Sequence, residues 1–395
     1  MDNFPDEIIT IILSNLPVKS IMQCRSVCQT WRAIIDNPSF VELHFNTSTT
    51  SESGNATSLI FIPNFLDEIY TAREDIKVPG DLKTTKIDIS LEVRISNLIE
   101  PPVNGLVFMY SSIYYNCSSG RDSSMFICNP ATRNVVKLPS CNPIQFKRAQ
   151  LVRGFGFDKV NQEFKAVQIV SSVFNWTNGT ASEVQVYTLG SNSWVNIGRT
   201  PDVLFFNGSV FVNGASHWLT QNKLQDGIIP PFSMSIVSFH LTSLEFSFIP
   251  TPEFGFLENP DFEFNSEKIQ LVGLGECLSI VDSTFEDHID VWVMKDHNAM
   301  ESWTRFSVTK YYMDNLRFTV VQLISFLRND SEIVLLYGSS RLVAYNIHYR
   351  SFRSLEIDGL PGYSLRYGIS PNFYKVYAYD ESLHAPRPTK VEQPL

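Results

Sequence analysis

Few residues in this chain form a pattern that is typical of a catalytic or metal-binding site. Acids stand beside histidines at Glu286-Asp287-His288 and at Asp296-His297, a pairing used in metal binding and in general acid–base catalysis. Both pairs lie in polar, turn-like stretches, so we expect solvated charges there. Cys24 and Cys28 are one helical turn apart, but the sequence has no second pair of ligands to complete a zinc site. We therefore interpret them as small buried side chains.

Motifs for hydrolysis and nucleotide chemistry are missing. The sequence has no Gly-x-Ser-x-Gly elbow, no phosphate-binding P-loop and no His-Glu-x-x-His motif. Gly154-x-Gly156 and Gly273-x-Gly275 each lack the third glycine of a dinucleotide fingerprint. His217, beside Trp218, is expected on an inner strand. The sequence therefore predicts no catalytic residue, no metal site and no cofactor.

Composition narrows the class of protein. The 395 residues are 44% hydrophobic and 18% charged, which is typical of a folded globular chain. A net charge of −10 leaves no basic surplus for a nucleic-acid backbone. The N-terminus lacks a secretory signal, its apolar run is too short for a bilayer, and the six cysteines show no disulfide pattern. We expect an intracellular protein, cytoplasmic or nuclear, that binds neither nucleic acid nor membrane.

The first 45 residues predict a small helical unit with more apolar surface than it can bury. Pro5 suits a first helical turn, Pro17 ends that helix, Ser20 can cap the next, and Asn37-Pro38 ends the second apolar stripe. Three short helices cannot enclose all the apolar side chains that recur at helical spacing: Ile8, Ile9, Ile12, Leu13, Leu16, Ile21, Cys24, Val27, Cys28 and Trp31. A docking module is the favoured interpretation. A helical cap packed on its own β domain is the alternative.

Three blocks of this segment resemble the F-box motif of plant F-box proteins. They are Phe4-Pro5, the block from Ile8-Ile9 to Leu16-Pro17-Val18-Lys19-Ser20, and Val27-Cys28-Gln29-Thr30-Trp31. Phe4 stands where the family usually has Leu, and Gln23-Cys24 where a basic–aromatic pair is common. The resemblance implies binding to the Skp-type adaptor of an SCF (Skp, cullin, F-box) ubiquitin ligase, and through it to a cullin scaffold. The implied contact residues are Pro5, Ile8, Leu16, Pro17, Val27, Cys28 and Trp31.

The remaining chain is mainly β, with one recurring unit. An apolar strand, a polar turn and a second strand, often followed by Pro, recur from Phe126, Val184, Ile236, Ile289 and Val343. The aromatic anchors of four copies are roughly 50 residues apart, a period typical of propeller blades: Trp194, Phe246, Trp303 and Phe352. A closed ring buries blade faces that a single blade leaves open. We expect a kelch-like β-propeller of about six to eight blades, the last closed by strands from both ends. Packed β-sandwiches are the alternative.

Composition also predicts the domain limits. The helical module covers 1–45, the polar tract 46–57 is a linker, the propeller covers 58–384 and the Pro-rich end 385–395 is a flexible tail. Candidate recognition loops, chosen by length and aromatic content, are Ser111–Ser124, Phe174–Ala181 and Phe254–Phe264.

The β region resembles the plant F-box-associated domain, which is kelch-like and has relatives at self-incompatibility loci. The resemblance rests on Asn104-Gly105-Leu106-Val107, Asn129-Pro130-Ala131-Thr132-Arg133, Gly154-Phe155-Gly156-Phe157-Asp158, Phe164-Lys165-Ala166-Val167, Asp290-Val291-Trp292-Val293-Met294-Lys295 and Glu301-Ser302-Trp303. We expect these residues to be structural, with Gly and Asn-Pro in turns and the aromatics packed between blades.

Together the two resemblances imply a non-catalytic adaptor. Its propeller would bind a protein target for ubiquitination and degradation, at residues that the sequence does not identify. A propeller lectin or enzyme with a helical cap is the alternative.

Overall fold

The computed structural model describes most of the chain. The described residues are 5–50, 58–63, 68–74, 81–87, 97–111, 124–141, 149–172, 182–201, 203–205, 208–222, 234–252, 268–310, 321–327, 331–337, 341–360 and 374–386. Phe4, residues 112–123 of the first candidate loop, the other two candidate loops and residues 387–395 of the predicted tail lie outside them.

Four helices form the N-terminal part, which we call the helical module, where the sequence predicts three. They are α1 (Asp6–Ser14), α2 (Val18–Cys24), α3 (Gln29–Ile35) and α4 (Pro38–Thr50). Ser20 lies inside α2 and does not cap it, because the extended residue Pro17 already precedes the helix. No described helix is long and apolar enough to cross a membrane.

Helix α4 continues into the first residues of the predicted linker. The hydroxyl groups of Thr47 and Thr49 donate to the carbonyls of Leu43 and Phe45, four residues earlier, at 2.8 and 3.0 Å. Polar side chains that bond back to their own helix allow this polar tract to stay helical. The rest of the predicted linker, 51–57, is outside the described residues.

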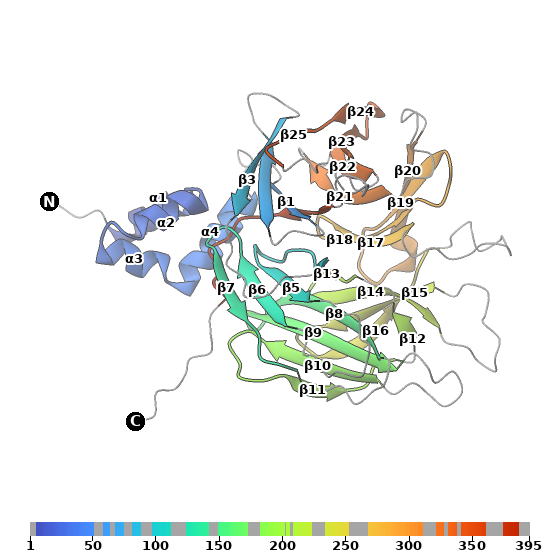
Figure 1. The fold of residues 1–395 in the computed structure, drawn as a ribbon, viewed down its shortest axis with the longest axis horizontal. Helices are drawn as coiled ribbons and strands as arrows, with labels where there is room; N and C mark the ends of the chain where they lie inside the picture. Colours follow the sequence, from blue (N-terminus) through green and yellow to red (C-terminus); the bar gives the residue numbers. More distant parts are fainter. Residues whose placement is uncertain are drawn as a thin grey trace, which may run out of the picture.

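Six sheets surround a common centre, so the predicted propeller is confirmed with six blades and the β-sandwich alternative is wrong (Figure 1). Blades are numbered in chain order. Blade one comprises β1 (Ser58–Pro63), β2 (Ile69–Glu74), β3 (Asp81–Ile87), β25 (Glu356–Asp358) and β26 (Tyr374–Tyr379). Blade two comprises β4 (Asn97–Ile99), β5 (Val107–Ser111), β6 (Met125–Asn129) and β7 (Asn134–Lys137). Blade three comprises β8 (Ala149–Asp158), β9 (Glu163–Ser172), β10 (Ser182–Thr188) and β11 (Val195–Gly198).

The second half of the ring repeats this order. Blade four comprises β12 (Val203–Phe205), β13 (Val210–Val212), β14 (Ala215–Asn222), β15 (Met234–His240) and β16 (Glu245–Ile249). Blade five comprises β17 (Ile269–Leu274), β18 (Cys277–Asp282), β19 (His288–Met294) and β20 (Trp303–Thr309), with a short 3₁₀ helix at Met300–Ser302. Blade six comprises β21 (Val321–Leu327), β22 (Glu332–Tyr337), β23 (Arg341–Asn346) and β24 (Ser351–Ser354).

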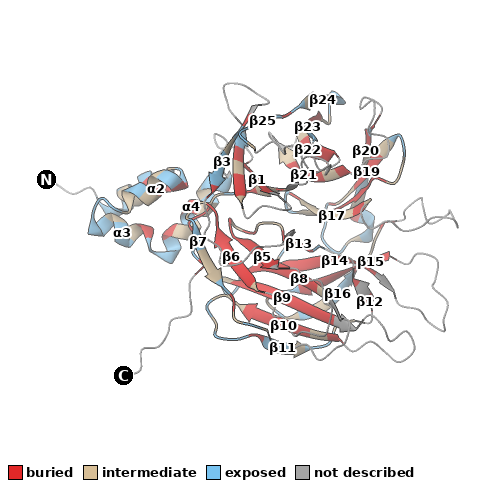
Figure 2. Ribbon diagram, in the orientation of Figure 1, coloured by how far each residue is buried: buried red, intermediate tan, exposed pale blue. Residues whose placement is uncertain are grey.

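The ring is closed by strands from both ends of the domain, as the sequence predicts. β26, near the C-terminus, pairs antiparallel with β1 over Ser58–Pro63 and becomes the innermost strand of blade one. The five predicted repeats are the outer hairpins of blades two to six, β6–β7, β10–β11, β15–β16, β19–β20 and β23–β24. Figure 2 shows that burial follows the blades, whereas much of the helical module is exposed.

Two of the anchor tryptophans join consecutive blades. Trp194 of blade three donates its Nε1–H to the carbonyl of Pro139, which follows blade two, at 2.9 Å. Trp303 of blade five makes the same bond to Pro250, which follows blade four, also at 2.9 Å. The Trp and the Pro of the repeat therefore form one inter-blade contact, because a buried indole N–H needs an acceptor.

The motif glycines Gly154 and Gly156 are not in turns, contrary to expectation. Both lie within β8, where a Cβ on Gly154 would lie 2.8 Å from Cζ2 of Trp218 and a Cβ on Gly156 would overlap the ring of Phe211. Blade four therefore approaches the β8 backbone too closely for any other residue. Gly105 does occupy a turn, with a φ of +75°.

Candidate protein-docking site on the helical module

The helical module has a small core to which the propeller contributes. Its buried apolar residues are Leu13, Val18, Ile21, Ile35, Phe40 and Leu383. The last of these comes from residues 380–386, the segment that follows β26, which we call the C-terminal strap. His44 on α4 is buried, and its Nε2 donates to the carbonyl of Leu16 at 2.9 Å, which ties α4 to the turn between α1 and α2.

A set of apolar side chains on this module is not covered by any described part of the chain. Five of the ten large apolar side chains that are exposed in the described residues belong to it: Ile8, Ile11, Ile12, Val27 and Leu43. Ile11 is 62% exposed, Ile12 55% and Val27 64%. Ile8, Ile11 and Ile12 are three and four residues apart on α1, so they share one face of that helix. The module thus packs on the propeller and still presents an apolar surface, which indicates an interaction site.

The predicted contact residues divide into two groups. Pro5, Ile8, Pro17, Val27 and Cys28 are exposed on the module. Leu16 and Trp31 are half-buried and pack against its core. Cys28 also has a structural role, because its Sγ accepts a hydrogen bond from the backbone N–H of Trp31 at 3.4 Å and so caps α3.

Three exposed residues, Ile11, Ile12 and Leu43, are absent from the predicted contact residues. Ile11 lies between the predicted stripe residues Ile8 and Ile12, and four isoleucines within the five positions 8–12 were the available signal. Leu43 belongs to α4, whose apolar pattern is weak. Which of these side chains is exposed depends on where α3 and α4 pack against α1. The spacing of apolar residues in the sequence does not predict that packing.

Motif residues of blade two hold the C-terminal strap in place. Asn129 donates from Nδ2 to the carbonyls of Ser382 and His384 at 2.8 and 2.7 Å. Ser382 in turn donates from Oγ to the carbonyl of Asn104 at 2.7 Å. The turn motifs therefore do more than reverse the chain: they fix the strap that carries Leu383 into the helical module.

His384 is the main aromatic contact between the two parts. Its ring meets Phe45 of α4 edge-on at a centroid distance of 5.4 Å and Phe164 of β9 at 5.3 Å. Its Nε2 lies 3.6 Å from Oε2 of Glu42. A cavity of about 590 Å³ lies beside these residues, between the helical module and blades two and three.

Acid is expected to loosen this junction. Burial lowers the pKa of His384 despite the nearby Glu42 carboxylate, and burial also lowers the pKa of His44. Because the pKa of each histidine is lower in the folded state, the unfolded state binds more protons in acid. The contribution of the neutral histidines to the free energy of unfolding is therefore full above the ordinary histidine pKa and falls as pH drops below about 6.5. Each histidine adds a slope of at most about 1.4 kcal/mol per pH unit.

Hydrogen exchange of the backbone amides of residues 5–50 measures this effect between pH 7.5 and 5, after correction for the pH dependence of the intrinsic exchange rates. We expect protection of the module to fall with acid, and His384→Phe, which keeps an aromatic ring without the charge, to make the fall shallower. An unchanged pH dependence in His384→Phe would contradict the assignment.

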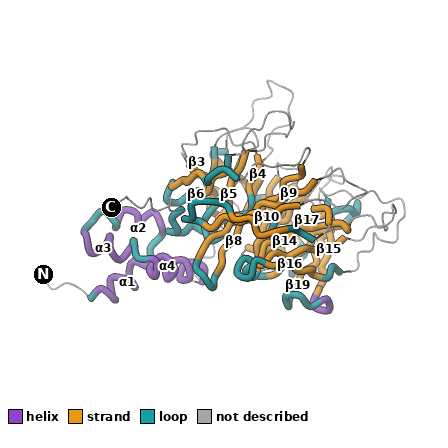
Figure 3. The backbone as a smooth tube through the Cα atoms, turned by 90° about the horizontal axis from the view of Figure 1, so that it is seen from below, coloured by secondary structure: helices purple, strands orange, loops and turns teal. Residues whose placement is uncertain are grey.

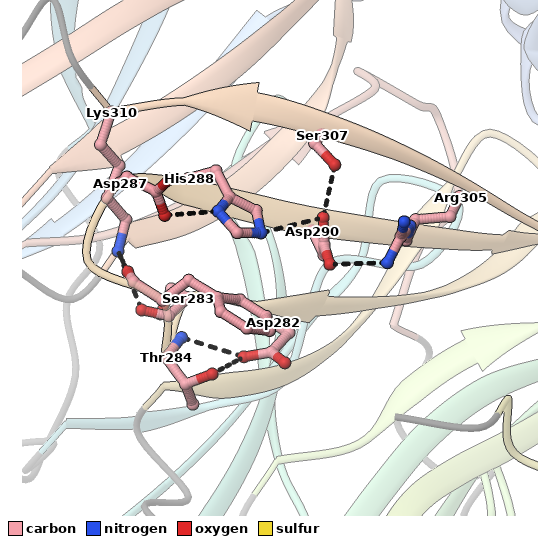
Figure 4. A network of polar contacts seen from close by, with 10 residues as sticks. Asp282, Ser283, Thr284, Asp287, His288, Asp290, Arg305, Ser307 and Lys310 are labelled. Atoms are coloured by element: carbon pink, nitrogen blue, oxygen red, sulfur yellow. Dashed lines mark hydrogen bonds and ion pairs between the residues drawn. The ribbon is translucent and has the colours of Figure 1, made fainter. Parts of the chain in front are cut away.

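In the acid–histidine motif on blade five, Glu286 and Asp287 are exposed, as the sequence predicts, whereas His288 lies in a polar network with neighbouring residues of the blade (Figure 4). His288 stacks on Phe285 and its Nδ1 bonds to Oδ1 of Asp287 at 2.6 Å. Asp290 is buried, accepts from Ser307 Oγ at 2.5 Å and lies 3.4 Å from Nη1 of Arg305. Asp290 thus contacts donors of the neighbouring strand, so it ties β19 to β20.

The other histidine candidates hold no metal cluster among the described residues. His217 is buried on β14, with Nδ1 3.2 Å from the carbonyl of Val210, and burial lowers its pKa to about 4. His297 is exposed, and its ring meets that of His217 edge-on at 5.5 Å. Cys24 is half-buried against the module core and Cys28 is exposed, both as free thiols.

Comparisons with known proteins match both parts of this geometry. The F-box domain family matches residues 1–43, and the F-box associated beta propeller domain family matches residues 63–379. An F-box protein of Arabidopsis thaliana is 28% identical over 92% of this chain and 89% of its own length. The Arabidopsis thaliana F-box protein CPR1 is 22% identical over 91% of this chain and 86% of its own length.

Similarity to solved structures is weaker. A lectin of Aleuria aurantia matches 78% of this chain and 97% of its own length, with 10% identity and a TM-score of 0.35. A match at this level carries no argument about function.

Proposed function

This chain belongs to the F-box proteins that carry an F-box associated β-propeller domain, and we propose that it is the substrate-recruiting subunit of an SCF-type ubiquitin ligase. The observation that carries the proposal is the apolar surface of the helical module, which stays exposed although the module packs on the propeller. Such a surface is stable in an assembly when a partner covers it.

The proposed partner of this surface is a Skp-type adaptor, bound in turn to a cullin scaffold. We propose contact through the residues predicted from the sequence, Pro5, Ile8, Leu16, Pro17, Val27, Cys28 and Trp31, and we add Ile11 and Ile12 because they are exposed on the same helix as Ile8. The half-buried Leu16 and Trp31 would support the surface from below.

The propeller would bind a protein target and hold it near a ubiquitin-conjugating enzyme carried elsewhere in the complex. Holding reactants close supplies the rate enhancement without an acid, base or nucleophile from this chain. The strap contacts of Asn129 and His384 support this role, because they fix the direction in which the propeller projects from the module. We place the working units at 1–45 and 58–384, joined by 46–57 and followed by a tail at 385–395. Helix α4 continues into the joining segment as far as Thr50, and the strap continues into the tail as far as residue 386.

Two measurements on the full chain test the proposal. Co-expressed Skp-type adaptor should co-purify with the intact chain at one copy each. Proximity labelling with the proteasome blocked should then capture targets, and their ubiquitinated forms should appear with the intact chain but not with a variant defective in adaptor binding. Failure of the adaptor to co-purify would refute the SCF role.

A further inference from the structure

The propeller contains a central cavity that the proposed role does not use. Its volume is about 480 Å³, within the range of small-molecule sites. Every blade contributes a part of its lining near the innermost strand: 100–103 from blade two, 151–153 from blade three, 208–211 from blade four, 269–273 from blade five, 322–324 from blade six and 375–378 from blade one. The cavity is therefore the axial channel of the ring.

The charge inside this channel is opposite to that of the whole chain. The chain carries a net charge of −10. Among the described residues, the Lys, Arg, Asp and Glu side chains that line the channel are Lys375, Arg153 and Glu100, which makes two cations and one acid. A cationic cavity with low-dielectric walls concentrates anions.

The one acid that the described part of the chain places in the channel already accepts hydrogen bonds. Glu100 accepts from the backbone N–H of Ser209 at 3.0 Å, from Ser209 Oγ at 2.5 Å and from the hydroxyl of Tyr110 at 2.9 Å. Burial raises the pKa of Glu100, which favours its neutral form. Arg153 lies over the ring of Tyr110 at 4.2 Å and donates to Gln168 at 3.1 Å, so it is held in place.

Lys375 is the cation that has no such fixed arrangement. It lies on β26, and among the described residues it has neither a hydrogen bond nor an ion pair within contact distance. Burial lowers its pKa, and the charge of the Glu100 carboxylate in the same channel opposes that shift. Gln270, on β17, also lines the channel, and its Oε1 is buried with no hydrogen-bond partner. The Lys375 ammonium and the Oε1 atom of Gln270 thus lie in the same cavity without a hydrogen-bond partner among the described residues.

The rest of the lining is largely apolar. It includes Val103, Val152, Phe211, Leu271, Val272 and Leu323. An apolar wall with a few convergent polar groups is the usual composition of a small-molecule site.

We infer that the axial channel binds a small organic acid. Lys375 supplies the counter-charge to the carboxylate, Gln270 accepts a hydrogen bond from a donor of the ligand, and the apolar lining takes the hydrocarbon part. The inference is independent of adaptor binding, because residues of all six blades line the channel and the exposed apolar surface belongs to the helical module. The helices of that module stand to one side of the strands (Figure 3).

A matched pair of probes tests the charge requirement. 3-(4-Hydroxyphenyl)propanoate and 3-(4-hydroxyphenyl)propanamide have nearly the same shape, carry the same hydroxyl donor for Gln270 and differ in charge. Tyr110, Phe211 and Tyr377 in the lining favour an aromatic body. Calorimetric titration of the full chain should give at least tenfold tighter binding of the acid than of the amide. Equal affinity of the two probes, or no binding of the acid at millimolar concentration, would overturn the inference.

Substitution of the lysine locates the site. Lys375→Met, which keeps the aliphatic stem, should remove the preference for the acid, and Lys375→Arg should keep it. Lys83→Met, an exposed lysine of β3, is the control and should change nothing. If Lys375→Met binds the acid as the unaltered chain does, the anion binds elsewhere and the inference is wrong. Co-purification with the adaptor should be the same for all these variants, which separates this test from that of the proposed function.

Discussion

A chain carrying Ile12→Asp and Val27→Asp is expected to lose at least about a hundredfold in affinity for a Skp-type adaptor, since central apolar contacts are each worth about 2 kcal/mol. Both side chains are more than half exposed in the free protein, at 55% and 64%. The new carboxylates therefore remain in water until the adaptor covers them. Burying an unpaired charge in the interface then opposes binding.

The measurement is titration of purified adaptor into each full-length variant. Val195→Asp is the matched control, because Val195 is 59% exposed on β11 of the propeller, away from the module. It should bind the adaptor as the unaltered chain does. Unchanged affinity in the double variant would show that the exposed face of the module is not the docking site.

These positions give a cleaner test than the half-buried residues of the same module. Leu16→Ala and Trp31→Ala would also reduce adaptor binding, but both side chains pack against the module core. Their truncation would lower the stability of the module as well as remove a contact. Loss of binding in those variants would therefore not separate docking from folding.

Asp158→Asn is expected to lower the free energy of unfolding of the propeller by about 3 kcal/mol, the lower end for breaking a buried ion pair. The Asp158 carboxylate is buried and accepts from Lys165 Nζ at 2.7 Å and from Thr242 Oγ1 at 2.7 Å. Lys165 also donates to the carbonyl of Leu241 at 2.9 Å. The pair therefore joins blade three to blade four, and its loss leaves the Lys165 ammonium buried beside an uncharged amide.

Urea unfolding followed by tryptophan fluorescence measures this change. Glu163→Gln is the control, because that carboxylate is 4.0 Å from Lys165 and 44% exposed, and exposed pairs contribute less than about 1 kcal/mol. A loss no larger than that of Glu163→Gln would show that the pair does not hold the two blades together.

The same pair predicts a dependence on acid. Burial by itself would raise the pKa of Asp158, but the hydrogen bonds from Lys165, Asn161 and Thr242 outweigh it and lower the pKa well below its usual range. A carboxyl whose pKa is lowered by folding stabilises the folded state in its ionised form. This contribution to the free energy of unfolding is full above the ordinary aspartate pKa near 3.9 and is lost as pH falls below it. Asp158→Asn should remove this contribution to the acid-dependent loss of stability.

Local pattern was enough to predict most of the strands. The outer hairpins follow from alternation and turn residues, as in β15–β16 around Phe239 and Phe246, which lie directly opposite one another. The roughly 50-residue period then indicates a ring of blades. The number of blades required the structure, because β1 and β26 form one blade from strands more than 300 residues apart.

The docking surface was only partly predictable. The proline positions and apolar spacing located the module, and its match to the F-box domain over residues 1–43 agrees with that prediction. Exposure was not predictable, since Ile11 and Leu13 are both apolar residues of α1, yet Ile11 faces solvent and Leu13 is buried. The difference depends on which side of α1 meets α3 and α4.

Helix and strand periodicity and turn residues act over a few positions, so both parts of this protein follow from the amino-acid sequence. The contacts that join the two parts are visible only in the folded molecule. Leu383 and His384 lie in a short segment with no periodic pattern, and Asn129, more than 250 residues earlier, fixes that segment against the module. Folding of the chain likewise places Glu100, Lys375 and Gln270 in one channel. Contacts between such distant residues form only when the ring closes, so no local pattern records them.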